Sequence, residues 1–405
     1  MTEERRYDVA VIGAGPAGSR TAARVARAGL RVLLLEKRPR IGYPVRCAEA
    51  VGPREVVERY VALDPPLVSS PINGVLVVSP DGGRLSRAMP GIGFTVDREL
   101  FDVRLAEAAQ AAGAELRTSH QATALLRDEE GRICGLRVKD LLSGAGYDVR
   151  AAVVVGADGV ESLSPRWAGL KVGYRPEEIF SCAEELIEGI DVENLVIEFH
   201  LGLRFAPGGY AWVFPKGSAR ANVGVGLNSL RAGGKTAVEY LNGFIAHRCP
   251  SGRRTRLVVG GCVVARGLAA LAVDGFVAVG EAANQNNPFS GGGIINALEG
   301  ADMAASAIVA ALKRGNVSAK TLGAYTSEWR RTVGKANEAF YHAARIFYGL
   351  SDDEMSRVTR ELASAPGIFD EKGIKPLAMI RALVAAHPRF LVQFAGSWLG
   401  GRRRP

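Results

Sequence analysis

Four short runs of aliphatic and β-branched residues predict strands that are buried on both faces. They cover residues 7–12 (YDVAVI), 31–36 (RVLLLE), 152–155 and 275–279. Continuous apolar runs of this length are typical of parallel strands that helices cover. Residues 13–29 lie between the first two runs and carry Ala, Val and Arg at helical spacing, so this part of the chain predicts a βαβ unit.

Two other regions alternate apolar and polar side chains, which predicts antiparallel strands. They are residues 72–96 and 174–228, with stretches such as YAWVFPKG and RANVGVGLN. Helical patterns complete the chain. The helices are expected over 101–112, with Asp97 nearby as the N-cap, over 292–313, and over most of 315–405 with breaks at Pro366, Pro376 and Pro388.

The composition excludes a disordered chain. Hydrophobic residues make up 47% of the 405 residues and charged residues 23%, which is ordinary for a folded protein. The five Cys are scattered without a C-x-x-C pair, so we expect no metal or iron–sulfur site and a reduced, cytoplasmic setting. No run approaches the ~18 uncharged apolar residues of a membrane-spanning helix, and the first residues lead into a strand without a signal-peptide core.

The net charge of +9 is concentrated near the C-terminus, because residues 312–405 carry 16 Lys and Arg against 8 Asp and Glu. The remainder is close to neutral, which argues against a nucleic-acid groove. The tail ends in FAGSWLGGRRR (394–404). Apolar residues followed by three Arg suit an anionic bilayer surface, and a solvated chain end explains them equally well. Peripheral attachment to the inner face of the membrane therefore stays open.

The strongest local motif is GAGPAG, residues 13–18, between a predicted strand and a predicted helix. Gly13 permits the tight turn, Gly15 lets a pyrophosphate approach the backbone, and Gly18 allows close packing of helix and strand. The N-terminus of the helix adds free N–H groups and a positive dipole end. Glu36 ends the second strand, where an acid can bind ribose hydroxyls. The motif predicts a dinucleotide site.

Two further glycine-containing turns follow buried strands. Residues 280–296 contain GEAA, then NPFSGGG and Asn296, and three successive Gly at a helix start form an anion-stabilising nest. This arrangement suits the electron-rich edge of a reduced flavin. Residues 156–162 read GADGVES and come after the strand that ends at Val155.

Taken together, the three segments resemble the FAD-binding domain of glutathione-reductase-type flavoproteins, in the branch that contains aromatic hydroxylases. The resemblance implies FAD as cofactor and places Arg98 (in VDRELFD) near it. No second G-x-G-x-x-G is present for NAD(P)H, so electrons are expected from a ferredoxin-like donor or from transient NAD(P)H. The implied cofactor contacts are Gly13, Gly15, Pro16, Ala17, Gly18, Glu36, Lys37, Arg46, Cys47, Ala48, Arg98, Ala122, Asp158, Gly159, Glu281, Pro288, Gly291, Gly292, Gly293 and Ile294.

The expected fold is therefore α/β with three parts. A Rossmann-like FAD-binding domain is assembled from residues 1–71, 97–173 and 266–314. An antiparallel-sheet substrate domain, residues 72–96 and 174–265, is inserted in it, and a helical region follows over residues 315–405.

Two segments narrow the family. Residues 207–217 (PGGYAWVFPKG) resemble the YxWxFPKG signature of the geranylgeranyl reductase family, and residues 42–50 (GYPVRCAEA) resemble its PxxCGEG loop, with Ala48 and Ala50 where Gly is usual. The resemblance implies that reduced FAD saturates C=C bonds of isoprenoid chains in lipids or quinones.

Candidate catalytic residues are Cys47, Tyr210 and Trp212. Tyr210, Trp212 and Phe214 alternate, so they share one face of a strand and can either line an apolar substrate pocket or fill the core of the sheet. The thiol of Cys47 could donate the proton that alkene reduction requires, or be inert packing. Lys216 is expected as a solvated turn residue or as a phosphate anchor. The other four Cys are expected to be structural.

Two other functions remain open. A flavin-dependent monooxygenase or halogenase can use the same fold, and YAWVFP partly matches the WxWxIP strand of halogenases, with Tyr210 at the first Trp. A non-catalytic FAD-binding or lipid-binding protein is the third candidate.

Overall fold

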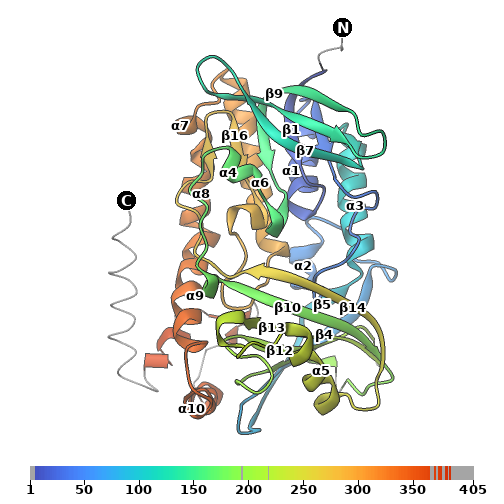
Figure 1. The fold of residues 1–405 in the computed structure, drawn as a ribbon, viewed down its shortest axis with the longest axis vertical. Coiled ribbons are helices and arrows are strands. Elements are labelled where there is room, and N and C mark those ends of the chain that lie inside the picture. The colour runs from blue at the N-terminus through green and yellow to red at the C-terminus, as the bar shows by residue number, and fades with distance from the viewer. Residues whose placement is uncertain are drawn as a thin grey trace.

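The computed structural model describes residues 5–192, 195–217, 219–364, 369–370, 373–375, 379–381 and 383–384. Two eight-stranded sheets lie at opposite ends of the molecule (Figure 1). The three expected segments build the first sheet and the alternating regions build most of the second. The α/β fold class predicted from the hydrophobic pattern is confirmed.

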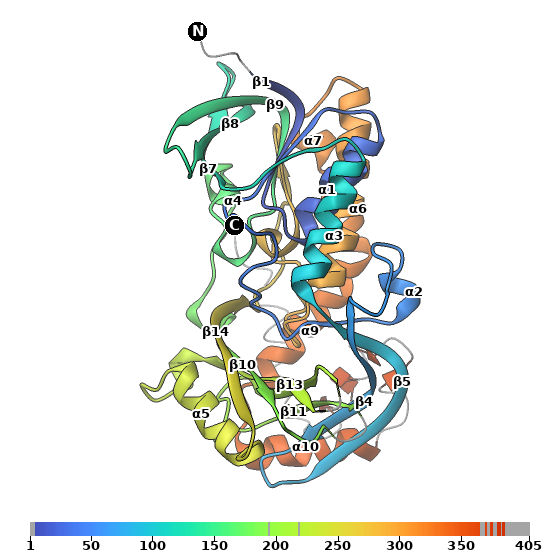
Figure 2. The ribbon, with the colours of Figure 1, turned by 90° about the vertical axis from the view of Figure 1, so that its right-hand side faces the viewer.

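The first sheet has the strand order β15-β16-β9-β1-β2-β6 and a central parallel part. The side chains of β2 are buried along its whole length, as the continuous apolar runs predicted. Helices α1, α3 and α6 cover one face, and the β7–β8 hairpin lies on the other side (Figure 2). The elements are β1 (Arg5–Ile12), α1 (Pro16–Arg27), β2 (Val32–Leu35), α3 (Arg98–Ala111), β6 (Glu115–Arg117), β7 (His120–Arg127), β8 (Ile133–Asp140), β9 (Gly146–Gly156), β15 (Ala272–Val273), β16 (Phe276–Ala278) and α6 (Ile294–Lys313).

The second sheet has the order β14-β10-β13-β12-β11-β4-β5-β3. Helix α5 (Ala237–Arg248) packs against β10 and β13 and buries Leu241 and Phe244. The strands are β3 (Ala50–Val51), β4 (Val68–Val78), β5 (Arg84–Val96), β10 (Ile179–Glu188), β11 (Ile197–His200), β12 (Tyr210–Pro215), β13 (Arg220–Asn228) and β14 (Arg253–Val263). We expected a wholly antiparallel sheet, which is wrong at one place, because β4 and β11 pair in parallel. They come from separate segments of the chain, so no tight turn forces them to run in opposite directions.

The C-terminal region begins with helices that connect the two ends of the molecule. Helix α8 packs against α6, and α9 continues towards the second sheet (Figure 1). The helices are α7 (Ala319–Leu322), α8 (Ala324–Arg331), α9 (Val333–Phe347) and α10 (Asp352–Ser364), followed by the short pair β17 (Phe369–Asp370) and β18 (Gly373–Ile374). The expected breaks at Pro366, Pro376 and Pro388 and the basic tail at 394–404 lie outside the described residues.

Short elements complete the connections that shape the site. Asp97 is the N-cap of α3, as predicted, because its carboxylate accepts a hydrogen bond from the Leu100 amide at 3.0 Å; the helix begins at Arg98, three residues before the expected start at residue 101. The remaining short helices are α2 (Arg54–Val57), η1 (Gly159–Glu161), α4 (Ser164–Trp167), η2 (Pro176–Glu178), η4 (Ser229–Arg231) and η5 (Gly280–Ala283).

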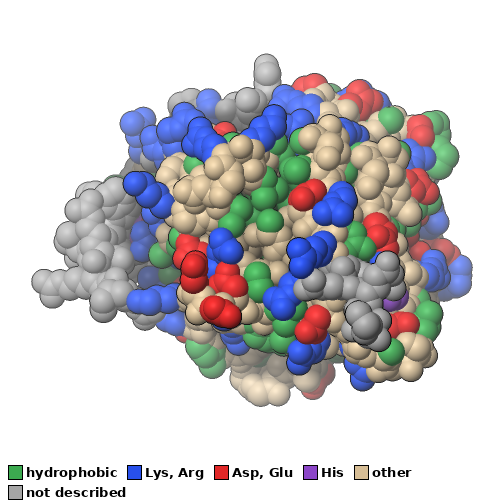
Figure 3. All heavy atoms as spheres, turned by 90° about the horizontal axis from the view of Figure 1, so that it is seen from above, with side chains coloured by type: hydrophobic (Ala, Val, Ile, Leu, Met, Phe, Trp, Pro, Cys, Tyr) green, Lys and Arg blue, Asp and Glu red, His purple; other side chains and the backbone are tan. Residues whose placement is uncertain are grey.

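Among the residues that the structure describes, one helix, α6, is long and apolar enough to cross a membrane by length and composition; it contains Glu299 and Asp302, so it is not the uncharged apolar run that the sequence analysis looked for. Half of its apolar window is buried inside the protein, and it packs against α1 and α8. The end of the molecule at the top of Figure 1 carries basic and acidic side chains interspersed around hydrophobic ones (Figure 3). This mixture agrees with the near-neutral charge of the N-terminal three quarters of the chain.

Candidate active site

The GAGPAG loop has the geometry of a phosphate cradle. Gly13 has φ +100°, and a Cβ there would lie 2.5 Å from the Ala157 carbonyl oxygen. A Cβ at Gly18 would lie 1.8 Å from the Gly13 carbonyl oxygen, so helix α1 requires glycine at both positions. A Cβ at Gly15, in contrast, would meet nothing within 4 Å, which leaves open space at the start of α1. These residues fit the pyrophosphate of FAD.

The Glu36 carboxylate lies beside this loop. It accepts hydrogen bonds from the Ala14 amide at 3.1 Å and from the Arg38 amide at 2.9 Å. Lys37 and Arg46 converge on Glu161, at 2.8 and 2.6 Å. Their hydrogen bonds lower the pKa of Glu161 to about 2. The structure thus brings residues of the first motif, the 42–50 loop and the third motif to one place.

The other predicted cofactor residues differ in whether their side chains already make contacts within the protein. The Asp158 carboxylate is occupied within its own turn, where it accepts from Ser164 Oγ at 2.6 Å and from the amides of Leu163 and Ser164. Gly159 follows at φ +73°. Ala122 is a buried residue of β7, and Arg98 forms a two-point ion pair with Asp102 at 2.9 and 3.0 Å.

The second motif contains a half-buried carboxyl group, that of Glu281. Glu281 accepts hydrogen bonds from Asn286 Nδ2 at 2.8 Å and from the Val263 amide at 3.3 Å, and burial raises its pKa. Gly291 has φ +71°, and the turn leads through Gly293 into α6 at Ile294. Glu281 thereby ties the glycine turn to the end of β14. Pro288 lies in the same turn and borders a pocket of about 200 Å³, which is lined also by Phe180, Val264, Tyr341 and Tyr348, with Arg231 and Arg345.

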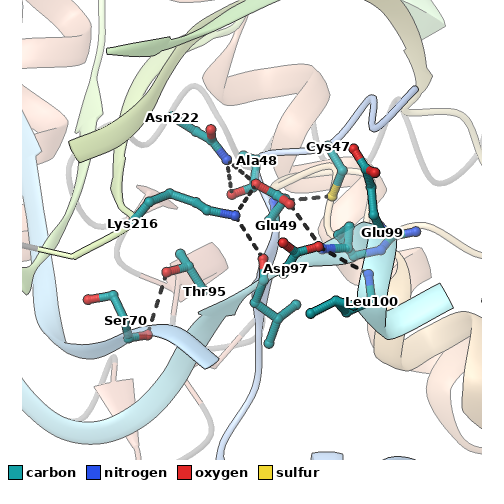
Figure 4. A network of polar contacts seen from close by, with 12 residues as sticks. Cys47, Ala48, Glu49, Ser70, Thr95, Asp97, Glu99, Leu100, Lys216 and Asn222 are labelled. Atoms are coloured by element: carbon teal, nitrogen blue, oxygen red, sulfur yellow. Dashed lines mark hydrogen bonds and ion pairs between the residues drawn. The ribbon is translucent and has the colours of Figure 1, made fainter. Parts of the chain in front are cut away.

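The loop at residues 42–50 is anchored by Glu49, whose side chain is buried although its backbone is left-handed, with φ +70°. Its carboxylate accepts from Lys216 Nζ at 2.7 Å, Asn222 Nδ2 at 2.7 Å and the Arg98 amide at 3.0 Å (Figure 4). Of our two expectations for Lys216, the solvated turn residue is wrong, because the side chain is 12% exposed and paired with Glu49; the phosphate anchor stays a prediction. The ammonium points inward because it neutralises a buried carboxylate, which an exposed lysine would leave unpaired.

This anchoring fixes Cys47 and its neighbour Ala48. The Cys47 amide donates to Glu184 Oε1 at 3.1 Å, and its sulfur accepts from the Glu49 amide at 3.3 Å. The Ala48 carbonyl accepts from Asn222 Nδ2 at 3.2 Å. Burial raises the pKa of the Cys47 thiol, so the thiol is neutral at neutral pH.

The aromatic side chains of β12 share one face, as their alternation predicted. The ring centroids of Tyr210 and Trp212 are 5.8 Å apart, and those of Trp212 and Phe214 are 6.4 Å apart. Trp212 and Phe214 are 7% and 8% exposed, so both are largely packed into the sheet, while Tyr210 is more accessible and its hydroxyl donates to the Ser290 carbonyl. Tyr210 therefore connects the aromatic face to the glycine turn.

Sequence reasoning missed several polar groups here. Cys182 and Cys262 were expected to be structural. Together with Cys47, they interact electrostatically with the Tyr210 hydroxyl and contribute to its raised pKa, after the larger effect of burial. We call Cys47, Cys182, Cys262 and Tyr210 the thiol cluster. Glu184 lies beside it and interacts with Cys47 and Cys182. The alternation of β10 offered a weak signal for Glu184, because every second residue shares a face, but it could not tell which face turns towards the FAD-binding sheet.

The fold and the glycine loops define an FAD-dependent oxidoreductase. An NAD(P)-binding Rossmann-like domain model matches residues 11–62, an FAD binding domain model matches residues 95–220, and a geranylgeranyl reductase catalytic domain model matches residues 178–264. Solved structures of flavin enzymes share the fold. One is a flavin-dependent brominase with 18% identity and a TM-score of 0.72, over 95% of this chain and 100% of that chain.

Full-length relatives define the family more narrowly. The chain is 39% identical to the digeranylgeranylglycerophospholipid reductase of Methanocella arvoryzae, over 96% of this chain and 98% of the relative. It is also 39% identical to the reductase of that name from Methanosarcina mazei, over 95% of each. A geranylgeranyl bacteriochlorophyll reductase-like protein from Thermoplasma acidophilum has a TM-score of 0.89 at 29% identity, covering 97% of this chain and 99% of that chain. This protein belongs to the geranylgeranyl reductase family.

Proposed function

We propose that this protein saturates C=C bonds of geranylgeranyl chains carried by a glycerophospholipid. The single observation that carries the proposal is 39% identity over 96% of the chain to a reductase named for that substrate. Bound FAD, once reduced, supplies the hydride for such a reaction. The chain's own residues bind the cofactor, orient the alkene and keep bulk water away from it.

The proposed roles follow the geometry. Gly13, Gly15 and Gly18 hold the pyrophosphate, and the turn at residues 288–294 borders the flavin. The thiol cluster and Trp212 form the surroundings of the alkene, where neutral thiols and aromatic rings favour an apolar chain. The pocket beside Pro288 is lined by aromatic side chains, by Arg231 and Arg345, and by the carboxylates of Glu177 and Glu178. We propose it as part of the path for the isoprenoid chain.

Two further elements belong to the proposal. Electrons come from an external donor, either a ferredoxin-like protein or NAD(P)H, and the lipid is collected at a membrane surface. Both follow from the chemistry, because a lipid substrate resides in a bilayer and the described chain has one dinucleotide loop of the GAGPAG type.

The proposed boundaries between the FAD-binding domain and the substrate domain follow the two sheets. Strand β4 of the second sheet begins at Val68, four residues before the boundary expected from the sequence.

The decisive experiment is anaerobic reduction of the FAD-loaded protein with dithionite, followed by addition of a geranylgeranyl glycerophospholipid in detergent. We expect reoxidation of the flavin and a product that gains two hydrogens for each double bond reduced. The fully saturated phytanyl lipid is the matched control and should leave the flavin reduced. A flavin that is reoxidised only by oxygen, with an aromatic substrate hydroxylated or halogenated, would instead indicate the monooxygenase or halogenase. Lipid binding without reoxidation would indicate a binding protein.

A further inference from the structure

We propose that Glu184 is the acid that donates the proton to the alkene. The inference rests on the proposed function and names a catalytic residue for it. Three observations carry it: the position of Glu184 in the sheet, the state of its two carboxyl oxygens, and the kinds of acid around it.

The strand register places Glu184 on the aromatic face. Glu184 of β10 pairs with Gly224 of β13, and Gly224 pairs with Trp212 of β12. Directly paired residues point to the same side of a sheet, so Glu184 and Trp212 lie on either side of a position without a side chain. The indole fills that gap, since a Cβ at Gly224 would be 2.2 Å from Trp212 Cζ2.

The next row repeats the arrangement. Cys182 pairs with Gly226, and Gly226 pairs with Tyr210. Glu184 thus stands in a two-row array with Trp212 and with two members of the thiol cluster, Cys182 and Tyr210, on the face of the second sheet that meets the 42–50 loop. The neighbouring Glu185 points to the other face, where its carboxylate pairs with Arg254 at 2.6 Å.

The two oxygens of Glu184 are not equivalent. Oε1 accepts the Cys47 amide at 3.1 Å, which fixes the carboxyl group against the loop. Oε2 is buried and has no hydrogen-bond partner among the described residues. A buried oxygen without a donor destabilises the carboxylate form and leaves room for a proton that points at a ligand.

The net effect of burial and of the surrounding charges on Glu184 also favours its protonated form. Burial and the Glu49 carboxylate raise the pKa of Glu184 to about 7, against weaker opposing effects of the Cys47 amide, Arg256 and Lys216. The thiols are much weaker acids, because burial raises the pKa of Cys47 and brings that of Cys182 to about 12. An acid with a pKa near the working pH is the most effective general acid, so Glu184 is a better donor than either thiol.

The proton balance is simple. One alkene carbon receives a hydride with its electron pair, which is the chemistry that the reduced cofactor supplies. The Glu184 O–H bond breaks, a C–H bond forms at the other alkene carbon, and Glu184 is left as a carboxylate. Solvent protonates it before the next turnover.

The test compares Glu184→Gln with Glu185→Gln as the matched control in the FAD-loaded protein. In single-turnover reoxidation with the lipid, E184Q should be slowed by at least about 100-fold at unchanged lipid affinity, and E185Q should keep the wild-type rate. The wild-type rate should fall as the pH rises through about 7, because the donor is the protonated form.

A second measurement does not depend on turnover. The infrared difference spectrum of the wild type minus E184Q should contain a protonated-carboxyl C=O band that disappears with a midpoint of about 7, and E185Q minus E184Q should contain the same band; taking the difference removes the contribution of Glu281. An E184Q variant that reduces the lipid at the wild-type rate, or a difference spectrum without this band, would overturn the proposal.

Two outcomes remain distinct. If E184Q does not retain FAD, Glu184→Asp and the wild-type pH profile decide the matter, and a flat profile between about pH 6 and about pH 8.5 overturns the proposal. If the wild type never reduces the lipid, the proposed function itself fails, which is separate from a wild type that turns over without using Glu184.

Discussion

The buried pair of Lys216 and Glu49 makes a strong prediction about the stability of the 42–50 loop. Changing Lys216 to Met keeps most of the aliphatic stem and removes the ammonium. The two side chains are 12% and 9% exposed, and the Nζ–Oε2 distance is 2.7 Å. Breaking a buried pair by removing one partner costs about 3–5 kcal/mol, because the other charge stays buried. Since Asn222 and the Arg98 amide still donate to Glu49, we expect about 3 kcal/mol.

Two further variants, Glu49→Gln and the double variant E49Q/K216M, complete a double-mutant cycle and test whether the loss of stability comes from an unpaired buried charge. Glu49→Gln keeps the shape but leaves the Lys216 ammonium with the Val96 carbonyl and an amide oxygen. The double variant E49Q/K216M contains no uncompensated charge, so its loss should be smaller than the sum of the single losses by about 1–3 kcal/mol.

Urea unfolding of the FAD-loaded protein, followed by circular dichroism and by release of flavin fluorescence, measures each value. Lys139→Met, at an exposed position of β8, is the matched control and should change stability by less than about 0.5 kcal/mol. A K216M variant as stable as the control, or strictly additive losses, would refute the reasoning.

Three further predictions concern other parts of the molecule. Gly18→Ala should destabilise the fold, since its Cβ would lie 1.8 Å from the Gly13 carbonyl oxygen. Gly15→Ala should change the free energy of unfolding by less than about 1 kcal/mol, but it should weaken FAD binding, which a fluorescence titration measures. Glu184 alone should lower the wild-type free energy of unfolding by about 3 kcal/mol between about pH 5 and about pH 8, because its folded pKa of about 7 lies above the value of 4.5 for a free Glu and the folded state holds the extra proton. Urea unfolding at several pH values measures this loss. E184Q should lack it, and the same pH dependence in E184Q and the wild type would contradict the assignment. Arg248→Met should lower the free energy of unfolding by about 3–5 kcal/mol at neutral pH in the same assay, because it leaves the buried Glu198 carboxylate without its guanidinium partner. Near pH 2 the loss should be much smaller, because the pKa of Glu198 is about 2 and the carboxylate can be protonated there. Equal losses at both pH values would argue against this explanation.

Much of the cofactor region could be predicted from the sequence because its signals are local. The strand, glycine turn and helix at residues 7–29 follow from backbone rules that act within a few residues. The Asp97 cap and the shared face of Tyr210, Trp212 and Phe214 depend on spacing alone. Relatives at 39% identity then confirm the family that two short signatures had indicated.

The polar groups of the site could not be predicted in this way. Glu49, Lys216 and Asn222 come from a loop and from the end and interior of different strands, and no local pattern joins them. Lys216 followed a Pro and preceded a Gly, which is typical of a solvated turn, so its burial depended on a carboxylate 167 positions away. The parallel pairing of β4 with β11 likewise arises between distant segments.

The sequence by itself determined the strands, the dinucleotide loop, the FAD-binding class and the reductase family, because each rests on contacts between near neighbours in the chain. Only the tertiary structure decided which of two adjacent glutamates, Glu184 and Glu185, faces the thiol cluster. It also decided that Cys47 is held as a neutral thiol. The physical reason is that side-chain orientation in a sheet and the pKa of a buried group depend on register and on charges from distant segments, which come together only when the chain folds.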